Sequence, residues 1–426
     1  MMNDLGTLGG SRSSAEGINA EGLVVGEAQA VDGTWHAFLW EPESGMKQLD
    51  IPVAVSSKAI AINDSAQVVG EFTDADGEKW AFIWTAGDGA QVIPVLYAPF
   101  TVEDINASGQ VLITAYDSDD TNADLHIIVW SASDGLLDLD SPYPQELVNV
   151  CTITDSGDII GYSTDAGPMA GCFEFSFILS QDGRITDLPS INTSESIDGE
   201  NDCRVYNSNK LGQIVGEIDY TKTETHAWLW TPRNMEIVRQ KPVRVEISFT
   251  IVDKRGSVWK YKNIPHEEMT FMQKDDHTVC RFTAIDSKGR PKEIVLKLEE
   301  GMCFDKQGER TLTYYILENL RGKPVRTYFH VSKLSSYEMT DIGMLDGLYA
   351  CGLSINNASQ VVGSGRNGEG FERAFFWSRD TGILDIGTLG GQNSCAEDIN
   401  DEGTVVGWAE NSQGQKRAFT WHQSMQ

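Results

Sequence analysis

One stretch of the chain interleaves basic and aromatic side chains, a combination that can hold an anionic partner or a nucleic acid. The nine residues that we treat as candidate partner-binding residues are Lys254, Arg255, Trp259, Lys260, Tyr261, Lys262, Lys288, Arg290 and Lys292. Such a surface could instead dock on an acidic part of its own chain or bind a protein partner. These two alternatives stay open, and nucleic acid or lipid is the least favoured occupant.

Two acidic stretches could bind calcium, which takes six to eight oxygen ligands. DADGE at 74–78 and DSDDTNAD at 117–124 place carboxylates two residues apart. Neither matches a complete calcium-loop pattern, so solvated loop tips are the favoured interpretation. Asp74, Asp76 and Glu78 remain the calcium candidates, and no other cofactor is expected.

Acidic residues at comparable places in several repeated segments could act as an acid–base pair, because glycosidases flank the scissile bond with two carboxylates. They include Glu16, Glu103, Asp104, Glu397 and Asp398. Nothing in the sequence singles out a pair, and no G-x-S-x-G, H-E-x-x-H or metal-spaced Cys/His set is present. Catalysis is therefore an alternative that the sequence does not favour.

Two histidines occupy the same slot of a repeated motif, His36 in HAFLW and His226 in HAWLW. Other copies hold Trp80, Arg373 or Arg417 in or near that slot. This variation predicts packing at the start of a strand and not ligand binding. The Trp that ends the motif is expected to fill the space between neighbouring sheets.

A sevenfold repeat must position all these residues. GINAEGLVVGE at 17–27 has six further copies, and HAFLW or a variant follows each copy. In the fourth and fifth copies, Thr154 and Asn207 are aligned with the Asn of the first signature. The copies occupy residues 17–27, 61–71, 104–114, 152–162, 205–217, 354–364 and 398–408.

Each unit is predicted to form four short strands, with a turn at Asn-x-x-Gly because Asn and Gly tolerate left-handed backbone angles. Such a repeat is typical of a β-propeller. The seventh copy ends at Trp421-His422 without a fourth strand, whereas DLGTLGG at 4–10 has no unit before it. Pairing residues 3–8 with the last unit would remove two open sheet edges. The predicted fold is all-β: a seven-bladed β-propeller closed by an N-terminal strand.

An insertion interrupts the fifth unit. The step from Asn207 to Asn356 is 149 residues, and taking out the 104 residues of 233–336 reduces it to 45. Six strand-like segments there predict a small antiparallel β domain. The predicted domains are residues 1–232 (closing strand and blades 1–5), 233–336 (inserted domain) and 337–426 (the end of blade 5 with blades 6 and 7). The insertion should leave between third and fourth strands, on the face of the Asn-x-x-Gly turns.

The motifs DLGTLGG, IN-x-x-G-x-VVG and HAF-x-W resemble those of the HAF-repeat family of bacterial proteins. Residues 6–10, 18–19, 24–26 and 36–40 carry the resemblance, which extends over about 320 residues outside the insertion. The fourth copy departs most, with Thr154 in place of Asn. The resemblance implies the repeat fold and often an extracellular location, but no defined activity.

Charge separates the insertion from the repeats. The whole chain has a net charge of −30, whereas residues 238–336 contain 19 Lys and Arg against 13 Asp and Glu, which is +6. The remainder is therefore −36, a charge that disfavours nucleic acid and anionic lipid. The seven cysteines form no CxxC pair and are expected to be free thiols.

The sequence shows no signal peptide and no apolar run long enough to span a bilayer, so the expected location is cytoplasmic or reached by signal-peptide-independent export. The favoured function is a non-catalytic scaffold for protein–protein interaction. Binding would use the inserted basic domain, the variable-loop face of the propeller, or both. A propeller-type carbohydrate-active enzyme with channel carboxylates is the alternative. A protein partner is expected, with no nucleic acid or membrane insertion, and a monomer is favoured.

Overall fold

A computed structural model covers the 426-residue chain. It describes residues 2–117, 125–139, 147–164, 174–181, 183, 185–189, 203–219, 221, 224–232 and 337–423. Within 233–336 it describes only the backbone of the strands. The described residues include no helix long and apolar enough to cross a membrane.

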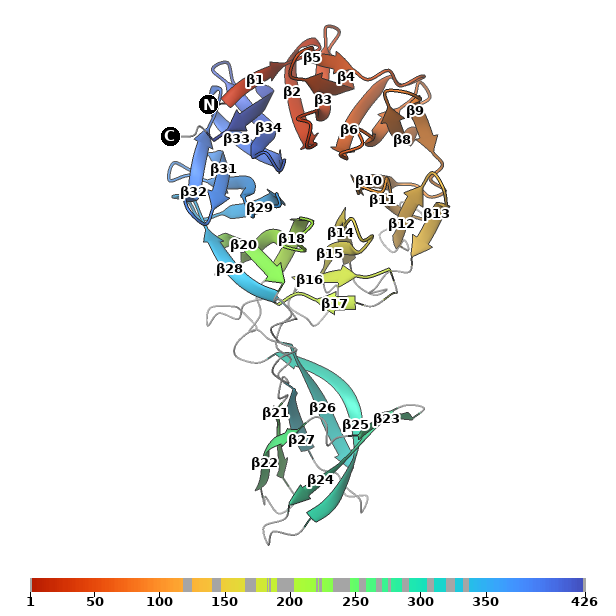
Figure 1. The fold of residues 1–426 in the computed structure, drawn as a ribbon, viewed down its shortest axis with the longest axis vertical. Coiled ribbons are helices and arrows are strands. Elements are labelled where there is room, and N and C mark those ends of the chain that lie inside the picture. The colour runs from red at the N-terminus through yellow and green to blue at the C-terminus, as the bar shows by residue number, and fades with distance from the viewer. Residues whose placement is uncertain are drawn as a thin grey trace. The chain divides into compact units, whose positions relative to one another are not determined.

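Seven four-stranded antiparallel sheets, the blades, are arranged in a ring (Figure 1). Blade 1 contains β2 (Gly9–Ile18), β3 (Val24–Ala30), β4 (Trp35–Glu41) and β5 (Gly45–Gln48). Blade 2 contains β6 (Ser56–Ile62), β7 (Val68–Thr73), β8 (Lys79–Thr85) and β9 (Gly89–Ile93). Blade 3 contains β10 (Phe100–Ile105), β11 (Val111–Tyr116), β12 (Leu125–Ser131) and β13 (Gly135–Leu139). Blade 4 contains β14 (Leu147–Ile153), β15 (Ile159–Thr164), β16 (Glu174–Leu179) and β17 (Ile185–Asp187).

The remaining blades draw on distant parts of the chain. Blade 5 contains β18 (Cys203–Ser208), β19 (Ile214–Asp219), β20 (Thr225–Pro232) and β28 (Tyr337–Gly343). Blade 6 contains β29 (Ala350–Ile355), β30 (Val361–Arg366), β31 (Glu372–Ser378) and β32 (Gly382–Gly387). Blade 7 contains β33 (Gly390–Ile399), β34 (Thr404–Asn411), β35 (Lys416–His422) and β1 (Met2–Gly6). The first strand of each blade lies nearest the centre (Figure 1).

The N-terminal strand closes the ring, as the two DLGTLGG-like sequences predicted. β1 pairs antiparallel with β35, with Met2 opposite Trp421 and Asp4 opposite Phe419. Arg417 Nη2 lies 3.2 Å from Asp4 Oδ1, and Leu5 is buried among residues of blades 7 and 1. Because β1 and β35 come from opposite ends of the chain, this pairing stabilises the ring as a closed unit.

The repeated Val-Val-Gly sequence is explained by a bulge in each first strand. In blade 1 the pairing of β2 with β3 shifts register between Ala15 and Gly17. This brings the β2 backbone so close that a Cβ on Gly26 would lie 2.1 Å from the Ser14 backbone oxygen. Gly363 in blade 6 has the same close approach. A Cβ would therefore clash with the first strand in these two blades, whereas blade 3 has Ile113 at the equivalent position, opposite Val102.

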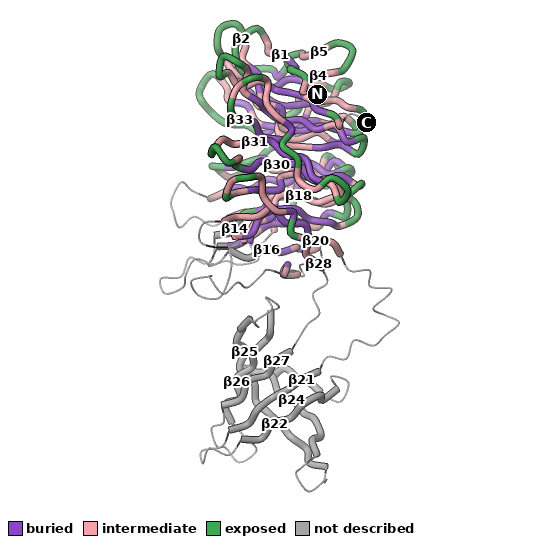
Figure 2. Tube along the Cα trace, turned by 90° about the vertical axis from the view of Figure 1, so that its left-hand side faces the viewer, coloured by how far each residue is buried: buried purple, intermediate pink, exposed green. Residues whose placement is uncertain are grey.

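The blades pack through the third-strand motif. Its Phe is fully buried in five blades, as Phe38, Phe82, Phe177, Phe375 and Phe419. The Trp two residues later is buried in blades 5 to 7 but only half-buried in blades 1 to 3. The Phe and not the Trp is thus the deepest side chain of the motif. Figure 2 shows buried residues along the strands and exposed residues at the turns of both faces.

The insertion joins β20 to β28, so it leaves between the third and fourth strands of blade 5 as predicted. It forms one seven-stranded sheet, one strand more than the six predicted segments; β23 is the additional strand. Residues 233–337 belong to a compact unit separate from the propeller. Its strands are β21 (Glu246–Val252), β22 (Val258–Pro265), β23 (Thr270–Lys274), β24 (His277–Ile285), β25 (Pro291–Phe304), β26 (Arg310–Glu318) and β27 (Arg326–Val331).

Candidate functional site

A ring of asparagine side chains circles the centre of the propeller where the first strands end. Asn19 Nδ2 donates to the backbone oxygen of Asn63 in the next blade, at 3.3 Å. The same bond, at 2.8 to 3.1 Å, joins Asn63 to Asn106, Asn106 to Thr154, Asn209 to Asn356, Asn356 to Asn400 and Asn400 to Asn19. Each Asn of the repeat signature therefore ties its own turn to the neighbouring blade.

The ring has one gap, between blades 4 and 5. Thr154 stands in the Asn position of blade 4 and has no amide that could donate to Asn209. Asn209, and not Asn207, occupies the ring in blade 5, because its Oδ1 accepts the backbone N–H groups of Leu211 and Gln213. The sequence alignment on Asn207 was wrong by two residues, since blade 5 offers two Asn residues close together.

The Asn ring borders a polar cavity of about 210 Å³ at the centre of the propeller. Lys210 of blade 5 reaches to blade 2, where its Nζ lies 3.2 Å from Asp64 Oδ2. Asp155 and Asp401 also line the cavity. The hydrogen bond with Asp64 and these carboxylates raise the pKa of Lys210. Lys210 is therefore a cation that links blades 5 and 2 across the cavity on the Asn-turn side.

Two of the predicted carboxylates, Asp104 and Asp398, line the same cavity but connect blades. Asp104 Oδ2 accepts the Thr152 hydroxyl at 2.6 Å and the Ile153 N–H at 3.1 Å. Asp398 accepts the Ser354 hydroxyl at 2.7 Å and the Ile18 N–H at 2.8 Å. Burial raises the pKa of Asp104 to about 6 and also raises that of Asp398.

Two glutamates one position earlier in their strands have fewer donors. Burial raises the pKa of Glu103 to about 7, and the carboxylates of Glu71 and Asp104 add to the rise. Burial, assisted by the charge of Glu16, raises the pKa of Glu397 to about 7. These groups lie on different blades, 3 and 7, and are the carboxyls best suited to carry a proton near neutral pH.

The histidine slot at the start of the third strand forms pairs within a blade. His226 Nδ1 lies 3.0 Å from both carboxylate oxygens of Asp341 on the fourth strand. Arg373 makes the equivalent ion pair with Asp385, at 3.1 Å. A basic side chain opposite an Asp thus recurs with different residue types, which agrees with the predicted structural role of the slot.

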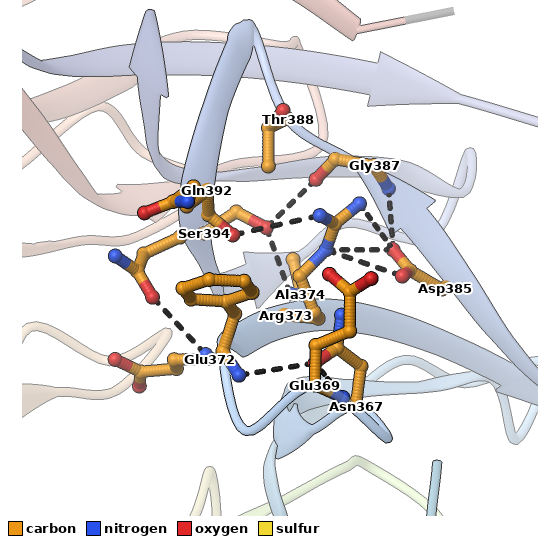
Figure 3. Close-up of polar contacts among 12 residues, drawn as sticks. Asn367, Glu369, Glu372, Arg373, Ala374, Asp385, Gly387, Thr388, Gln392 and Ser394 are labelled. Carbon is orange, nitrogen blue, oxygen red and sulfur yellow. Dashed lines mark hydrogen bonds and ion pairs between the residues drawn. The ribbon is translucent and has the colours of Figure 1, made fainter. Parts of the chain in front are cut away.

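The DIGTLGG sequence forms the corner between blades 6 and 7 (Figure 3). Asp385 Oδ1 accepts the Gly387 N–H at 2.8 Å while its carboxylate binds Arg373. The hydroxyl of Ser394 donates to the Gly387 oxygen and accepts the Ala374 N–H. DLGTLGG at the N-terminus makes the same bonds through Asp4, Gly6 and Ser13. The motif is therefore a structural corner.

The calcium candidates lie at the tip of the β7–β8 loop. Asp74 Oδ1 accepts the N–H groups of Asp76 and Glu78 at 3.0 Å, and its Oδ2 accepts Trp80 Nε1 at 2.8 Å. Asp74 therefore caps its own turn. The described residues include no group of three or more His, Cys, Asp or Glu side chains that could hold a metal ion.

The candidate partner-binding residues of the insertion divide into two groups. Lys254, Arg255, Lys288 and Arg290 lie outside the described residues. Residues 259–262 fall in β22 and Lys292 falls in β25, where only the backbone is described. Whether these cations and rings form one surface stays a prediction from the sequence.

A feature that the sequence did not reveal is the distribution of exposed apolar side chains. We call the face formed by the second-to-third-strand loops and the inter-blade connections the loop face. Among the described residues, eleven large hydrophobic residues are exposed; six of them lie on the loop face, and of the eleven only Leu211 lies on the opposite, Asn-turn face. Five of the six come from blades 1 to 3, and we call them the loop-face patch: Val31, Val53, Val55, Trp80 and Leu96.

Solved structures resemble this chain in fold. The β-propeller domain of the Trilobed protease from Pyrococcus furiosus is 10% identical over 97% of this chain and 96% of its own, with a TM-score of 0.47. A streptogramin B lyase structure is 10% identical, covers 78% of this chain and 97% of its own, and has a TM-score of 0.34. The gluconolactonase XC5397 from Xanthomonas campestris is 10% identical, covers 78% of this chain and 89% of its own, and has a TM-score of 0.29.

No protein-family model and no curated protein sequence matches the chain. The propeller fold rests on the strand order of the seven sheets, and the resemblance to the HAF-repeat family is carried by the sequence motifs alone.

Proposed function

We propose that the protein is a non-catalytic scaffold that binds a protein partner through the loop face of its propeller. The observation that carries this proposal is the loop-face patch. Val31, Val53 and Leu96 are 85%, 76% and 78% exposed, although each is a large aliphatic residue. Single exposed apolar residues are ordinary, but five of them on the described loops and strand ends of adjacent blades 1 to 3 are typical of an interaction surface.

The backbone of Val53 supports a role for this side chain outside the fold. Val53 has φ 65, a left-handed angle that strongly disfavours β-branched residues. Glycine or asparagine would relieve the strain at this turn. A strained and exposed valine is better explained by a contact that the folded monomer does not itself provide.

Charge defines the kind of partner. The net charge outside residues 238–336 is −36, and Asp32, Asp74 and Asp76 lie on the loop face beside the patch. Acidic surroundings favour association with a basic partner and speed its encounter. The expected partner therefore presents apolar side chains flanked by Lys or Arg. The basic insertion remains a second candidate binding element.

Capture experiments with the full chain test this function. A Val53→Asp/Leu96→Asp variant should lose a protein that the unaltered chain enriches from cell lysate, because two buried carboxylates would disfavour the interface. Leu211→Asp is the matched control, since Leu211 is 59% exposed on the opposite face. Equal capture by all three proteins would exclude the loop-face patch as the binding surface.

A carbohydrate-active enzyme is the second candidate, favoured by the raised pKa values of Glu103 and Glu397. General acids with pKa near neutrality are characteristic of glycosidases. Hydrolysis of a glycoside that is lost in Glu103→Gln or Glu397→Gln, with the fold retained, would favour the enzyme. Capture that depends on the loop-face patch, with no such hydrolysis, would favour the scaffold.

A further inference from the structure

A cavity of about 350 Å³ lies among the first and second strands of blades 3 and 4 and the first strand of blade 5, and no residue of the loop-face patch lines it. Its volume is near the lower end of the range for small-molecule sites, about 300–1,000 Å³. The side chains with polar atoms that line it are mostly uncharged. They are Glu103, Thr114, Tyr116, Asn149, Tyr162 and Tyr206.

The aromatic wall of the cavity has a defined geometry. Tyr162 and Tyr206 meet edge to face, with ring centroids 6.5 Å apart and an interplanar angle of 66°. Tyr206 is held from behind, because its hydroxyl donates to Glu217 Oε1 at 3.2 Å. Burial raises the pKa of Tyr206, so the phenol stays neutral. A fixed ring face beside hydroxyl and amide groups suits a ligand with both C–H and O–H surfaces.

The charges around the cavity disfavour an anion. The described residues that line it include no Lys, Arg or His. Two cations on strands around the cavity are held in ion pairs: Arg204 binds Glu217 at 2.7 Å, and Lys79 binds Glu71 at 2.7 Å. A phosphate or carboxylate ligand would thus enter without a counter-charge, at a large cost in free energy.

The state of Glu103 disfavours a cation as well. Glu103 accepts a hydrogen bond from the Thr114 hydroxyl, and burial raises its pKa to about 7. A site built for an ammonium group would stabilise the carboxylate, whereas this environment opposes it. A protonated Glu103 can donate one hydrogen bond and accept others, as a hydroxylated ligand requires.

We propose that this cavity between blades 3 and 5 binds a neutral monosaccharide. The ring face of Tyr162 packs against C–H groups of the sugar. Glu103, Asn149 and the tyrosine hydroxyls exchange hydrogen bonds with its O–H groups. The cavity does not depend on the loop-face patch, so the site and the scaffold function can fail separately.

Saturation-transfer NMR with the full-length protein tests the site. The probes are glucose, galactose and N-acetylglucosamine, with choline and acetate as charged comparators whose C–H protons report transfer, each at about 10 mM, which saturates a site of millimolar Kd. We expect transfer to at least one sugar and to neither comparator. Absence of transfer to every sugar would overturn the proposal, and so would a stronger response from choline.

Substitutions in the cavity test whether the saturation transfer arises from a sugar bound there. Tyr206→Phe should weaken sugar binding about three- to tenfold, because the phenol oxygen, whose proton is donated to Glu217, can still accept one hydrogen bond from the sugar. Tyr349→Phe is the matched control: it also removes a phenol beside Glu217, but Tyr349 does not line the cavity. Tyr162→Ala should weaken binding more than tenfold, because the ring that packs against the sugar is lost. Tyr162→Phe keeps that ring and should therefore bind the sugar almost as well as the unaltered protein. Sugar binding that is equal in all variants would place it elsewhere and overturn the proposal.

Discussion

At the residue scale, the Asn of each repeat makes two kinds of hydrogen bond, one within its own turn and one to the next blade. Its carbonyl oxygen accepts two N–H groups of the turn, as Asn356 does from Ala358 and Gln360. Its amide donates to the next blade, as Asn356 does to Asn400. An Asp side chain has no N–H group to donate to the next blade, and a Thr side chain is too short to reach its backbone oxygen. The gap at Thr154 is therefore a local weakness that can be repaired.

Thr154→Asn should stabilise the propeller. The new amide would reach the Asn209 oxygen while its carbonyl replaces the Thr154 hydroxyl as acceptor of the Asp158 N–H. One added hydrogen bond contributes about 0.5–1.5 kcal/mol. Urea denaturation followed by tryptophan fluorescence measures the change. Asn356→Ala is the reciprocal test. It should lower the free energy of unfolding by about 2–4 kcal/mol, because its buried partners lose several hydrogen bonds. An unchanged free energy of unfolding in both variants would contradict the role assigned to the Asn ring.

Protonation of buried glutamates should make stability depend on pH. Glu103 and Glu397 have a pKa of about 7 in the folded protein, against the ordinary glutamate pKa of 4.5 that applies in the unfolded chain. Between these values the folded state holds protons that the unfolded state has released, so stability falls as pH rises. Each group contributes a slope of at most about 1.4 kcal/mol per pH unit.

Thermal denaturation between pH 5 and 7.5 checks this dependence. Glu103→Gln/Glu397→Gln should flatten the fall in Tm, because neither position then titrates. Glu43→Gln on an exposed turn controls for the loss of negative charge. A fall in Tm that is as steep in the double variant as in the unaltered protein would show that other groups cause it.

At the scale of the element, the ring depends on a strand contributed from the opposite end of the chain. β35 would be an open edge without β1, and open edges invite pairing with other chains. Removal of residues 1–6 should destabilise the propeller by roughly 4–8 kcal/mol, from the lost burial of Leu5 and the lost ladder bonds.

Calorimetry and light scattering would report this loss as a lower Tm and as association of the shortened chain. A synthetic peptide of residues 1–12 added in trans should restore Tm by pairing with β35. A shortened chain that stays monomeric with an unchanged Tm would contradict closure by β1.

Periodicity allowed the elements to be predicted from the sequence, whereas side-chain partners were not predictable. The four-strand units, the closure by residues 3–8 and the insertion between β20 and β28 all follow from repeat spacing. Asn207 was misaligned because two Asn residues compete within one strand end. Glu103 and Glu397 could not be selected from other acids, because their pKa depends on burial and on charges from other strands.

At the scale of the whole molecule, the two faces of the propeller differ in kind. The Asn-turn face is polar and bridged at its centre by Lys210 and Asp64. The loop face carries six exposed large hydrophobic residues among those described. A propeller that served only as a rigid support would not need this asymmetry, which is why we assign partner binding to the loop face.

The most direct test of that assignment compares the stability and the partner binding of Val53→Gly. Relief of the left-handed strain contributes about 1–2 kcal/mol, offset by about 0.5–1 kcal/mol for the greater freedom of glycine in the unfolded chain. We predict that the free energy of unfolding rises by roughly 0.5–1 kcal/mol while capture of the partner falls. A variant that is more stable and captures the partner as well as the unaltered chain would contradict the proposed role of the loop face.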